Sequence, residues 1–221
     1  MDFTSDCLMP CLLCYDNACH IEIAGLTLEK PGLLLLIYTG KPVSIHNTMI
    51  TLFVSDCNQI SQSFYDSVIN DVQLHQLTCF CGHSACLTVH GYYNRSVKKE
   101  EGAVCLRICR VRCSECGTTH ALLLSSIVPY SQISLADQQR IYNDYEAGNG
   151  SCEICRNHLS VDENNVKSVL RNYRRYWREK LRSLRIPLFP LTALVFSCFS
   201  HYSSQFMQIH RRSNRLFSYT T

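Results

Sequence analysis

Two close pairs of cysteines constrain this sequence more than any other feature. Cys79 and Cys81 are separated by one residue, and a Cys-x-x-Cys-Gly motif follows later at Cys113 and Cys116. Zinc takes four tetrahedral ligands, often thiolates that two separate turns supply in close pairs. The glycine lets the backbone turn so that its amides face the sulfurs. The pattern predicts a zinc site at Cys79, Cys81, Cys113 and Cys116, with Cys86 as a substitute for Cys79 or Cys81.

The total of 15 cysteines indicates reduced thiols rather than a disulfide framework. An odd number leaves one thiol over, and Met1–Cys14 lacks the basic region and apolar core of a signal peptide. The apolar stretches Leu33–Tyr38 and Leu188–Phe199 are too short to span a bilayer. We therefore expect a cytoplasmic, nucleoid-associated protein without a membrane segment, in which some thiols bind metal.

The segment between the two cysteine pairs has the pattern of a β-hairpin. Leu87–Tyr93 and Val104–Arg112 are predicted strands, and Lys98–Gly102 is a predicted turn. In the second strand, one face is predicted to carry Val104, Leu106 and Ile108, and the other Cys105, Arg107 and Cys109, with a phase shift near Arg110. Three arginines of this strand are expected to offset the charge of a four-thiolate zinc centre: Arg107, Arg110 and Arg112.

The remaining cysteines and histidines point less clearly to metal. Cys105 and Cys109 are interpreted as packing residues within a strand, and Cys152 and Cys155 form a Cys-x-x-Cys motif inside a helical pattern without a second pair. His83 and His120 are interpreted as hydrogen-bonding neighbours of the zinc ligands rather than ligands. A second site is an alternative for the N-terminal group of Cys7, Cys11, Cys14, Cys19 and His20.

Residues 131–185 have a helical pattern with three predicted helices. Ser134 caps the first, which ends at Gly148; Ser151 caps a short second helix through His158; and Asp162 caps a third from Glu163 to Leu184. Apolar residues at helical spacing form the predicted buried face of the third helix: Val166, Val169, Leu170, Tyr173, Tyr176, Trp177 and Leu181. A short helix, a turn and a longer basic helix are typical of helix-turn-helix DNA-binding domains.

The third helix is strongly basic, since Glu179 is the only acidic residue between Lys167 and Arg185. Asparagine and arginine contact adenine and guanine edges, and lysine and arginine neutralise phosphates. The predicted contacts to double-stranded DNA are Asn164, Asn165, Lys167, Ser168, Arg171, Arg174, Arg175 and Arg178. The alternative interpretation is a three-helix bundle with a charged surface.

A resemblance accompanies these motifs. The residues concerned are the run from Cys79-x-Cys-Gly-His83 to His90-Gly-Tyr-Tyr-x-Arg95, followed by Arg110-Val-x-Cys-x-x-Cys-Gly-x-Thr-His120. With these motifs the chain resembles a bacterial family of small transposon-associated proteins. Their zinc ribbon is similar to the N-terminal region of insertion-element transposases. Asp162-x-Asn-Asn-Val166 and Arg174-x-x-Trp177 stand where that family has its helix-turn-helix. The resemblance covers about residues 49–221 and implies DNA binding linked to transposition.

The expected fold class is therefore α+β, a small zinc-ribbon β-hairpin domain (49–130) followed by an all-α helix-turn-helix domain (131–185). Residues 1–48 are an uncertain Cys-rich extension, with Met49 as an alternative start, and 186–221 form an apolar and polar tail. We expect no catalysis, because the chain shows no room for a ribonuclease-H-like domain with its acidic triad. A separate transposase is then a candidate partner. Alternative functions are a transcriptional regulator, a metal- or redox-sensing DNA-binding protein, and an RNA-binding zinc ribbon.

Overall fold

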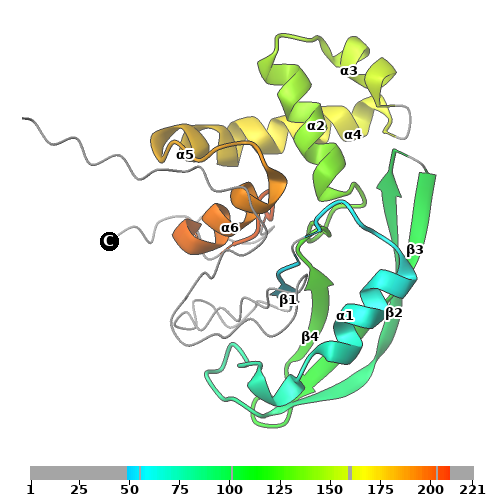
Figure 1. The fold of residues 1–221 in the computed structure, drawn as a ribbon, viewed down its shortest axis with the longest axis vertical. Helices are drawn as coiled ribbons and strands as arrows, with labels where there is room; N and C mark the ends of the chain where they lie inside the picture. Colours follow the sequence, from blue (N-terminus) through cyan, green and yellow to red (C-terminus); the bar gives the residue numbers. More distant parts are fainter. Residues whose placement is uncertain (1–48, 55, 101, 159–160, 203, 210–221) are drawn as a thin grey trace, which may run out of the picture. The chain divides into compact units, whose positions relative to one another are not determined.

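The sheet of this protein joins strands that are distant in the sequence. The computed structural model describes residues 49–54, 56–100, 102–158, 161–202 and 204–209. Its four strands are β1 (Met49–Leu52), β2 (Leu87–Lys99), β3 (Gly102–Cys113) and β4 (Thr119–Leu124), in the order β1-β4-β3-β2 (Figure 1). β1 pairs in parallel with β4, and the other two pairings are antiparallel. The protein is thus a mixed chain of helices and one four-stranded sheet, as the sequence predicted at this level.

The β2–β3 hairpin is longer than predicted, and burial along β3 does not follow a simple alternation. The predicted strands lie within β2 and β3, and the turn falls at Glu100 as expected. Cys109 is buried although it is two residues from exposed Arg107, and its neighbour Ile108 is buried as well, so burial does not follow the two faces of this strand. The opposite strand carries a β-bulge, because its register shifts between Val89 and Gly91.

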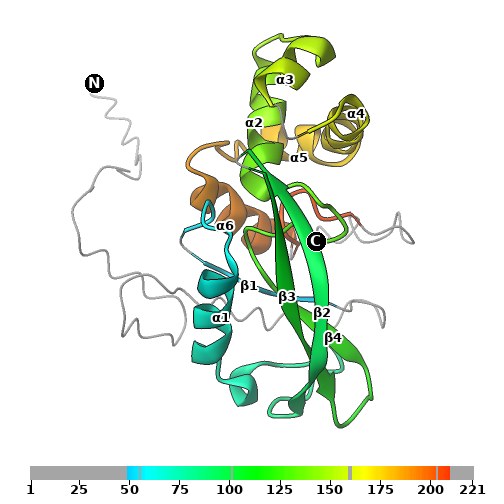
Figure 2. The same cartoon turned by 90° about the vertical axis from the view of Figure 1, so that its right-hand side faces the viewer.

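Helix α1 (Gln62–Asp71) covers the edge of β3 that β4 does not reach (Figure 2). The β3–β4 ladder stops at Arg110, and the next pair in its register would be Cys109 with Leu122. Between these two residues lies the Tyr65 hydroxyl, which accepts from the Cys109 amide at 2.8 Å and donates to the Leu122 carbonyl at 3.0 Å. One turn earlier, Gln62 Oε1 accepts from the Arg107 amide at 2.7 Å. Two side chains of α1 thereby replace a neighbouring strand.

The three predicted helices are present in the following segment. They are α2 (Leu135–Glu146), α3 (Ser151–Asn157) and α4 (Glu163–Asn172). The Ser134 and Asp162 side chains accept the capping hydrogen bonds from Asp137 and Asn165, which confirms both predicted caps. The prediction for Ser151 was wrong, because the N-cap of α3 is Gly150 and no side chain caps it.

The predicted third helix is continuous, but its backbone hydrogen bonding changes from α-helical to π-helical and back. After α4, a π-helical turn (η2, Tyr173–Trp177) leads directly into α5 (Arg178–Ser183). The predicted buried face is confirmed except at Tyr176, which is half-buried; the buried residues are Val166, Val169, Leu170, Tyr173, Trp177 and Leu181. The remaining side of this helix is therefore the side available to a ligand.

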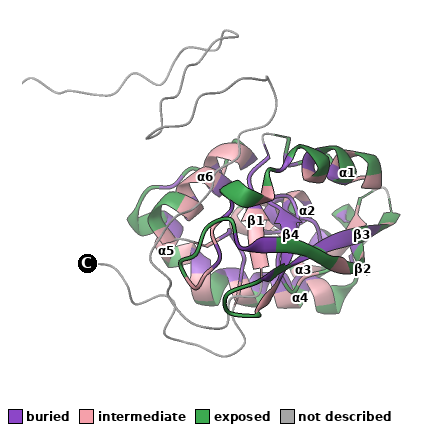
Figure 3. Cartoon of the chain, turned by 90° about the horizontal axis from the view of Figure 1, so that it is seen from below, coloured by how far each residue is buried: buried purple, intermediate pink, exposed green. Residues whose placement is uncertain are grey.

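Two groups of buried side chains stabilise these elements. One joins the inner face of the sheet to Tyr65 and Val68 of α1. The other joins α2–α5 to α6 (Leu191–Tyr202) and to Phe206. Residues Leu191, Leu194 and Val195 of the predicted tail thus belong to the core of the helices. Figure 3 shows the contrast between buried β4 and the exposed side of α1. In the described ranges, no helix has both the length and the apolar character needed to cross a membrane.

Candidate functional site

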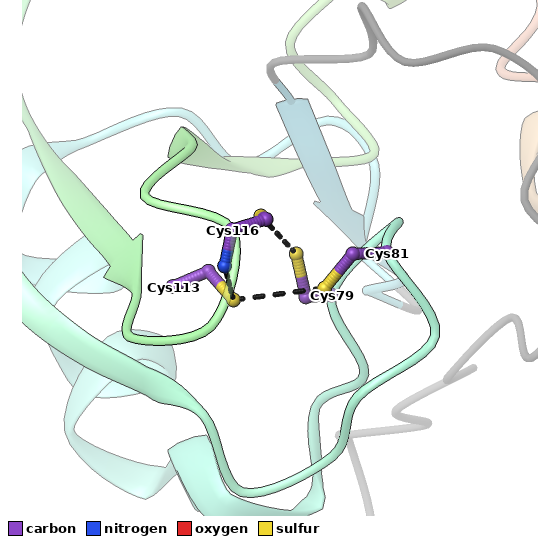
Figure 4. A group of neighbouring side chains, drawn as sticks. All are labelled: Cys79, Cys81, Cys113 and Cys116. Carbon is purple, nitrogen blue, oxygen red and sulfur yellow. Dashed lines mark hydrogen bonds between the residues drawn. The ribbon is translucent and has the colours of Figure 1, made fainter.

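The four cysteines of the two predicted pairs meet at one end of the sheet (Figure 4). Cys79 and Cys81 lie in the loop between η1 (Leu74–Gln76) and β2, whereas Cys113 ends β3 and Cys116 lies in the turn to β4. The antiparallel register places Leu87, the first residue of β2, opposite Cys113, so the loop before β2 lies beside the turn after β3. All four sulfurs lie within 4.8 Å of one another.

The sulfur positions fit a tetrahedral metal ion. Cys79 Sγ lies 3.6 Å from Cys116 Sγ, and Cys81 Sγ lies 3.7 Å from Cys113 Sγ. Sulfurs at the corners of a tetrahedron, each about 2.3 Å from a central zinc, would be about 3.8 Å apart. The two measured separations are close to that value. These four residues could therefore hold a metal ion at their centre.

Tight turns bring the sulfurs of each pair to the same side. The amide of Gly82 donates to the Cys79 carbonyl at 2.8 Å, and that of Gly117 donates to the Cys113 carbonyl at 3.0 Å. Gly82 and Gly117 have φ of 92° and 70°, in the left-handed region that favours glycine. In the second turn, the Cys116 amide points at Cys113 Sγ, 3.5 Å away. Such amide donors stabilise the negative charge of a thiolate.

The thiols of the cluster differ in how readily they ionise. Burial opposes ionisation of Cys113, but hydrogen bonds from the Cys116 amide and with the Cys86 thiol lower its pKa to about 6. Hydrogen bonds from Thr118 lower the pKa of Cys116. Burial instead raises the pKa of Cys79 well above its ordinary value. At neutral pH the second turn thus offers a thiolate to a cation, whereas Cys79 must lose a proton when the cation binds.

Two histidines lie beside the sulfurs but are not among the four clustered residues. His120 Nε2 lies 3.2 Å from Cys79 Sγ, and His83 Nδ1 lies 3.3 Å from Cys81 Sγ. His120 is buried, and its ring packs against Phe80 with 5.5 Å between centroids. Residues in such positions orient the ligands and donate hydrogen bonds to their charge.

Cys86 lies beside the cluster but is not one of the four residues grouped around its centre. Its thiol donates to the His83 carbonyl at 3.1 Å and lies 3.4 Å from Cys113 Sγ. Burial is the main cause that raises its pKa to about 11. Its position outside the group of four and its bond to the His83 carbonyl suit a hydrogen-bonding neighbour of the ligands.

We expect Cys86→Ser to retain the full metal content of the parent protein, because the substituted hydroxyl preserves a hydrogen-bonding group beside the four ligands. Metal analysis of the purified variant provides the measurement. Cys81→Ser is the matched comparison, and it should lower the metal content or its resistance to chelator. The opposite order of effects would make Cys86 the fourth ligand in place of Cys81.

The other described cysteines are not part of this cluster. Cys105 is exposed on β3, whereas Cys109 is buried on the inner face of the same strand. Cys152 and Cys155 lie on α3 and are not part of a metal-binding group among the described residues. The N-terminal group Cys7, Cys11, Cys14, Cys19 and His20 lies outside the described residues.

The predicted DNA contacts lie along the exposed side of the helix from α4 to α5. Asn164, Lys167 and Arg171 are exposed on α4, and Arg174 and Arg175 are exposed on the π-helical turn. Asn165 and Ser168 are half-buried. The Asn165 amide donates to the Asp162 carboxylate at 2.6 Å, so this side chain supports the start of the helix. Lys167 forms an ion pair of 2.7 Å with Glu163, one turn earlier.

Arg178 differs from the other predicted contacts because it has a strong partner within the protein. Its Nε lies 2.7 Å from Glu146 Oε1 at the end of α2, and Arg182 lies 3.0 Å from the other oxygen. Although burial opposes ionisation of Glu146, these two arginines lower its pKa. The sequence did not reveal Glu146 as a partner, because the contact joins two helices distant in the chain and has no local pattern.

A comparison with known proteins found one match, in the middle of the chain. Residues 78–158 match a family described as a domain of unknown function (DUF6431). The match begins just before Cys79 and ends with His158, after α3, so it includes all four clustered cysteines. Searches of curated proteins and of solved structures found no match.

Proposed function

We propose that this protein is a zinc-dependent DNA-binding protein, linked to transposition, that recognises duplex DNA through a helix-turn-helix formed by α2, α3 and α4. The observation that carries the proposal is that the helix from α4 to α5 has one buried side and one exposed, basic side. One side is buried against the other helices, and the other presents Asn164, Lys167, Arg171 and Arg174 at intervals of three or four residues. That spacing puts them on one stripe of a helix.

The cysteine cluster supports zinc as the metal of a structural zinc ribbon. Four thiolates in tetrahedral positions are the ligand set of structural zinc sites, which leave no position open for a substrate. Thiolates also disfavour magnesium and calcium, which bind through oxygen. The four ligands join the loop before β2 to the turn between β3 and β4. In this proposal the ion stabilises the sheet and takes no part in a reaction.

Different residues of the basic helix are assigned to different parts of the DNA. Asn164 and Arg171 are exposed side chains of the types that form paired hydrogen bonds with adenine and guanine. Lys167, Arg174 and Arg175 are suited to phosphates, which position the protein without reading sequence. Arg178 is assigned a structural role, because its ion pair with Glu146 joins α5 to α2.

The link to transposition rests on the resemblance of the cysteine and helix motifs to transposon-associated proteins. A transcriptional regulator would use the same contacts, so the DNA sequence bound distinguishes the two functions. Strong preference for the terminal repeats of a mobile element over promoter DNA would favour transposition. In this proposal the protein delivers a separate transposase to those ends and does not itself cut DNA.

The deciding experiment measures binding of the zinc-loaded protein to labelled duplex DNA and to single-stranded RNA over a range of salt concentrations. We expect duplex DNA to bind more tightly, with an affinity that falls steeply as salt rises, because phosphate contacts release counterions. Treatment with a zinc chelator is expected to weaken this binding. Equal or tighter binding to RNA, or no duplex binding at all, would contradict the proposed function.

Within this proposal, replacing Asn164 or Arg171 with alanine is expected to cost about 1–3 kcal/mol on the preferred DNA sequence and much less on random sequence. The joint change of Arg174 and Arg175 to alanine should weaken binding to all sequences and reduce the salt dependence. Competition titrations with specific and random duplexes measure both effects. Arg185→Ala removes an exposed arginine that follows α5, outside the three helices, and serves as the control. If both classes of variant bind DNA as tightly as the parent protein, the helix is only a charged surface and does not contact DNA.

A further inference from the structure

A second basic surface lies on β3, away from the basic helix. Arg107, Arg110 and Arg112 are exposed along this strand, whereas Ile108, Cys109 and Val111 between them are buried. Strand residues two apart share a face, so Arg110 and Arg112 point to the same side. The three arginines span about 16 Å along the strand, at roughly 3.3 Å per residue. We call this set the β3 arginine row.

Within the described ranges, no ion pair neutralises the β3 arginine row. The residues opposite these arginines on β2 are Asn94, Gly91 and Thr88, all uncharged. None of the ion pairs between described residues includes Arg107, Arg110 or Arg112. Other arginines differ in this respect: Arg140 pairs with Glu100 and Asp137, and both Arg178 and Arg182 pair with Glu146. The row is therefore uncompensated positive charge on the described surface.

Local contacts limit the motion of two members of the row. The Arg107 guanidinium lies over the Tyr92 ring, 4.1 Å from its centroid, and Tyr92 remains 48% exposed. A guanidinium stacked on an aromatic ring keeps its N–H groups directed outward for another acceptor. A guanidinium nitrogen of Arg112 lies beside Gly117, at the turn that carries Cys116. Preorganised charges of this kind lose less conformational entropy when a ligand binds.

We propose that the β3 arginine row is a second DNA-binding surface, which contacts the phosphate backbone of duplex DNA. The inference rests on the proposed function, since it assumes that the protein binds duplex DNA. Arginine is the side chain best suited to phosphate oxygens, because its planar donors match their geometry. From the sequence, we expected these arginines to offset the charge of the metal centre. Only Arg112 lies beside a metal-binding turn, whereas Arg107 and Arg110 extend the charge along the strand.

The test compares two variants that each remove two positive charges. Arg110→Gln with Arg112→Gln changes the row and leaves the Arg107–Tyr92 contact in place. Arg182→Gln with Arg185→Gln is the control, because both of these arginines are exposed at the end of α5 and neither is an assigned DNA contact. Binding to one duplex is measured against salt concentration. We expect the row variant to bind every sequence several-fold more weakly, with a salt slope reduced by about 2, and the control to keep the parental slope.

Further measurements separate the outcomes. Zinc content and thermal unfolding of the row variant should match the parent, because the substituted side chains are exposed. Arg110→Lys with Arg112→Lys keeps the charge and should restore most of the salt slope. Parental binding by the row variant, or an equal loss in the control, overturns the inference and leaves the proposed function standing. A parent protein that binds no duplex DNA overturns the proposed function itself.

Discussion

A variant in which Cys113 and Cys116 are both serine is expected to contain no zinc and to lose the ordered sheet. Two of four ligands are then missing, and both come from the turn that joins β3 to β4. Structural zinc contributes about 10–16 kcal/mol of apparent binding free energy in zinc-finger peptides at neutral pH, and this energy is folding free energy. Few domains have that much stability to spare.

Zinc content per chain and circular dichroism of the purified variant measure this effect. Cys105→Ser is the matched control, since Cys105 is an exposed thiol on the same strand and lies outside the cluster. It should keep the zinc content and stability of the parent. The parent itself should bind zinc less tightly as pH falls, because protons compete with the metal for the thiolates. Full zinc retention by the double variant would refute the metal centre.

Trp177→Ala is expected to lower the free energy of unfolding by about 3–5 kcal/mol, as is typical when a large aromatic side chain leaves a buried site. Trp177 is 0% exposed at the end of the π-helical turn. Its ring makes edge contacts with Tyr202 of α6 and with Phe206, at centroid distances of 5.8 and 5.2 Å. The alanine variant therefore loses contacts that join α4–α5 to the C-terminal helix.

Urea unfolding followed by circular dichroism measures the loss. Trp177 is the only tryptophan of the chain, so its fluorescence reports unfolding of the parent but not of the variant. Phe189→Ala removes an aromatic side chain that is 64% exposed, and its effect should stay within about 0.5 kcal/mol. If the two variants unfold at the same urea concentration, Trp177 does not stabilise the helical core as described.

The sequence predicted the local features of this protein well. Cysteine spacing identified the four clustered residues because each pair sits in a short turn of definite geometry. The Ser134 and Asp162 caps were recognisable because a capping side chain contacts an amide only three residues later. The buried face of the third helix followed from its apolar spacing.

The features that the sequence did not reveal are contacts between distant segments. Parallel pairing of β1 with β4 joins residues far apart in the chain, and no local pattern encodes it. Burial of both Ile108 and Cys109, which are neighbours in β3, depends on contacts with distant residues such as Tyr65, whose hydroxyl accepts from the Cys109 amide. The internal partner of Arg178 was equally hidden, since Glu146 lies on another helix.

The position of Tyr65 and Gln62 has a consequence for how this chain behaves among its own copies. An uncovered strand edge offers amides and carbonyls to any other strand, which is a common start of aggregation. Here the amides of Arg107 and Cys109 are already bonded to side chains of α1. A further strand cannot pair with these two amides, because side-chain oxygens of α1 already accept their hydrogen bonds. Helix α1 therefore ends the sheet along this part of β3 and keeps these two amides from pairing with a strand of another molecule.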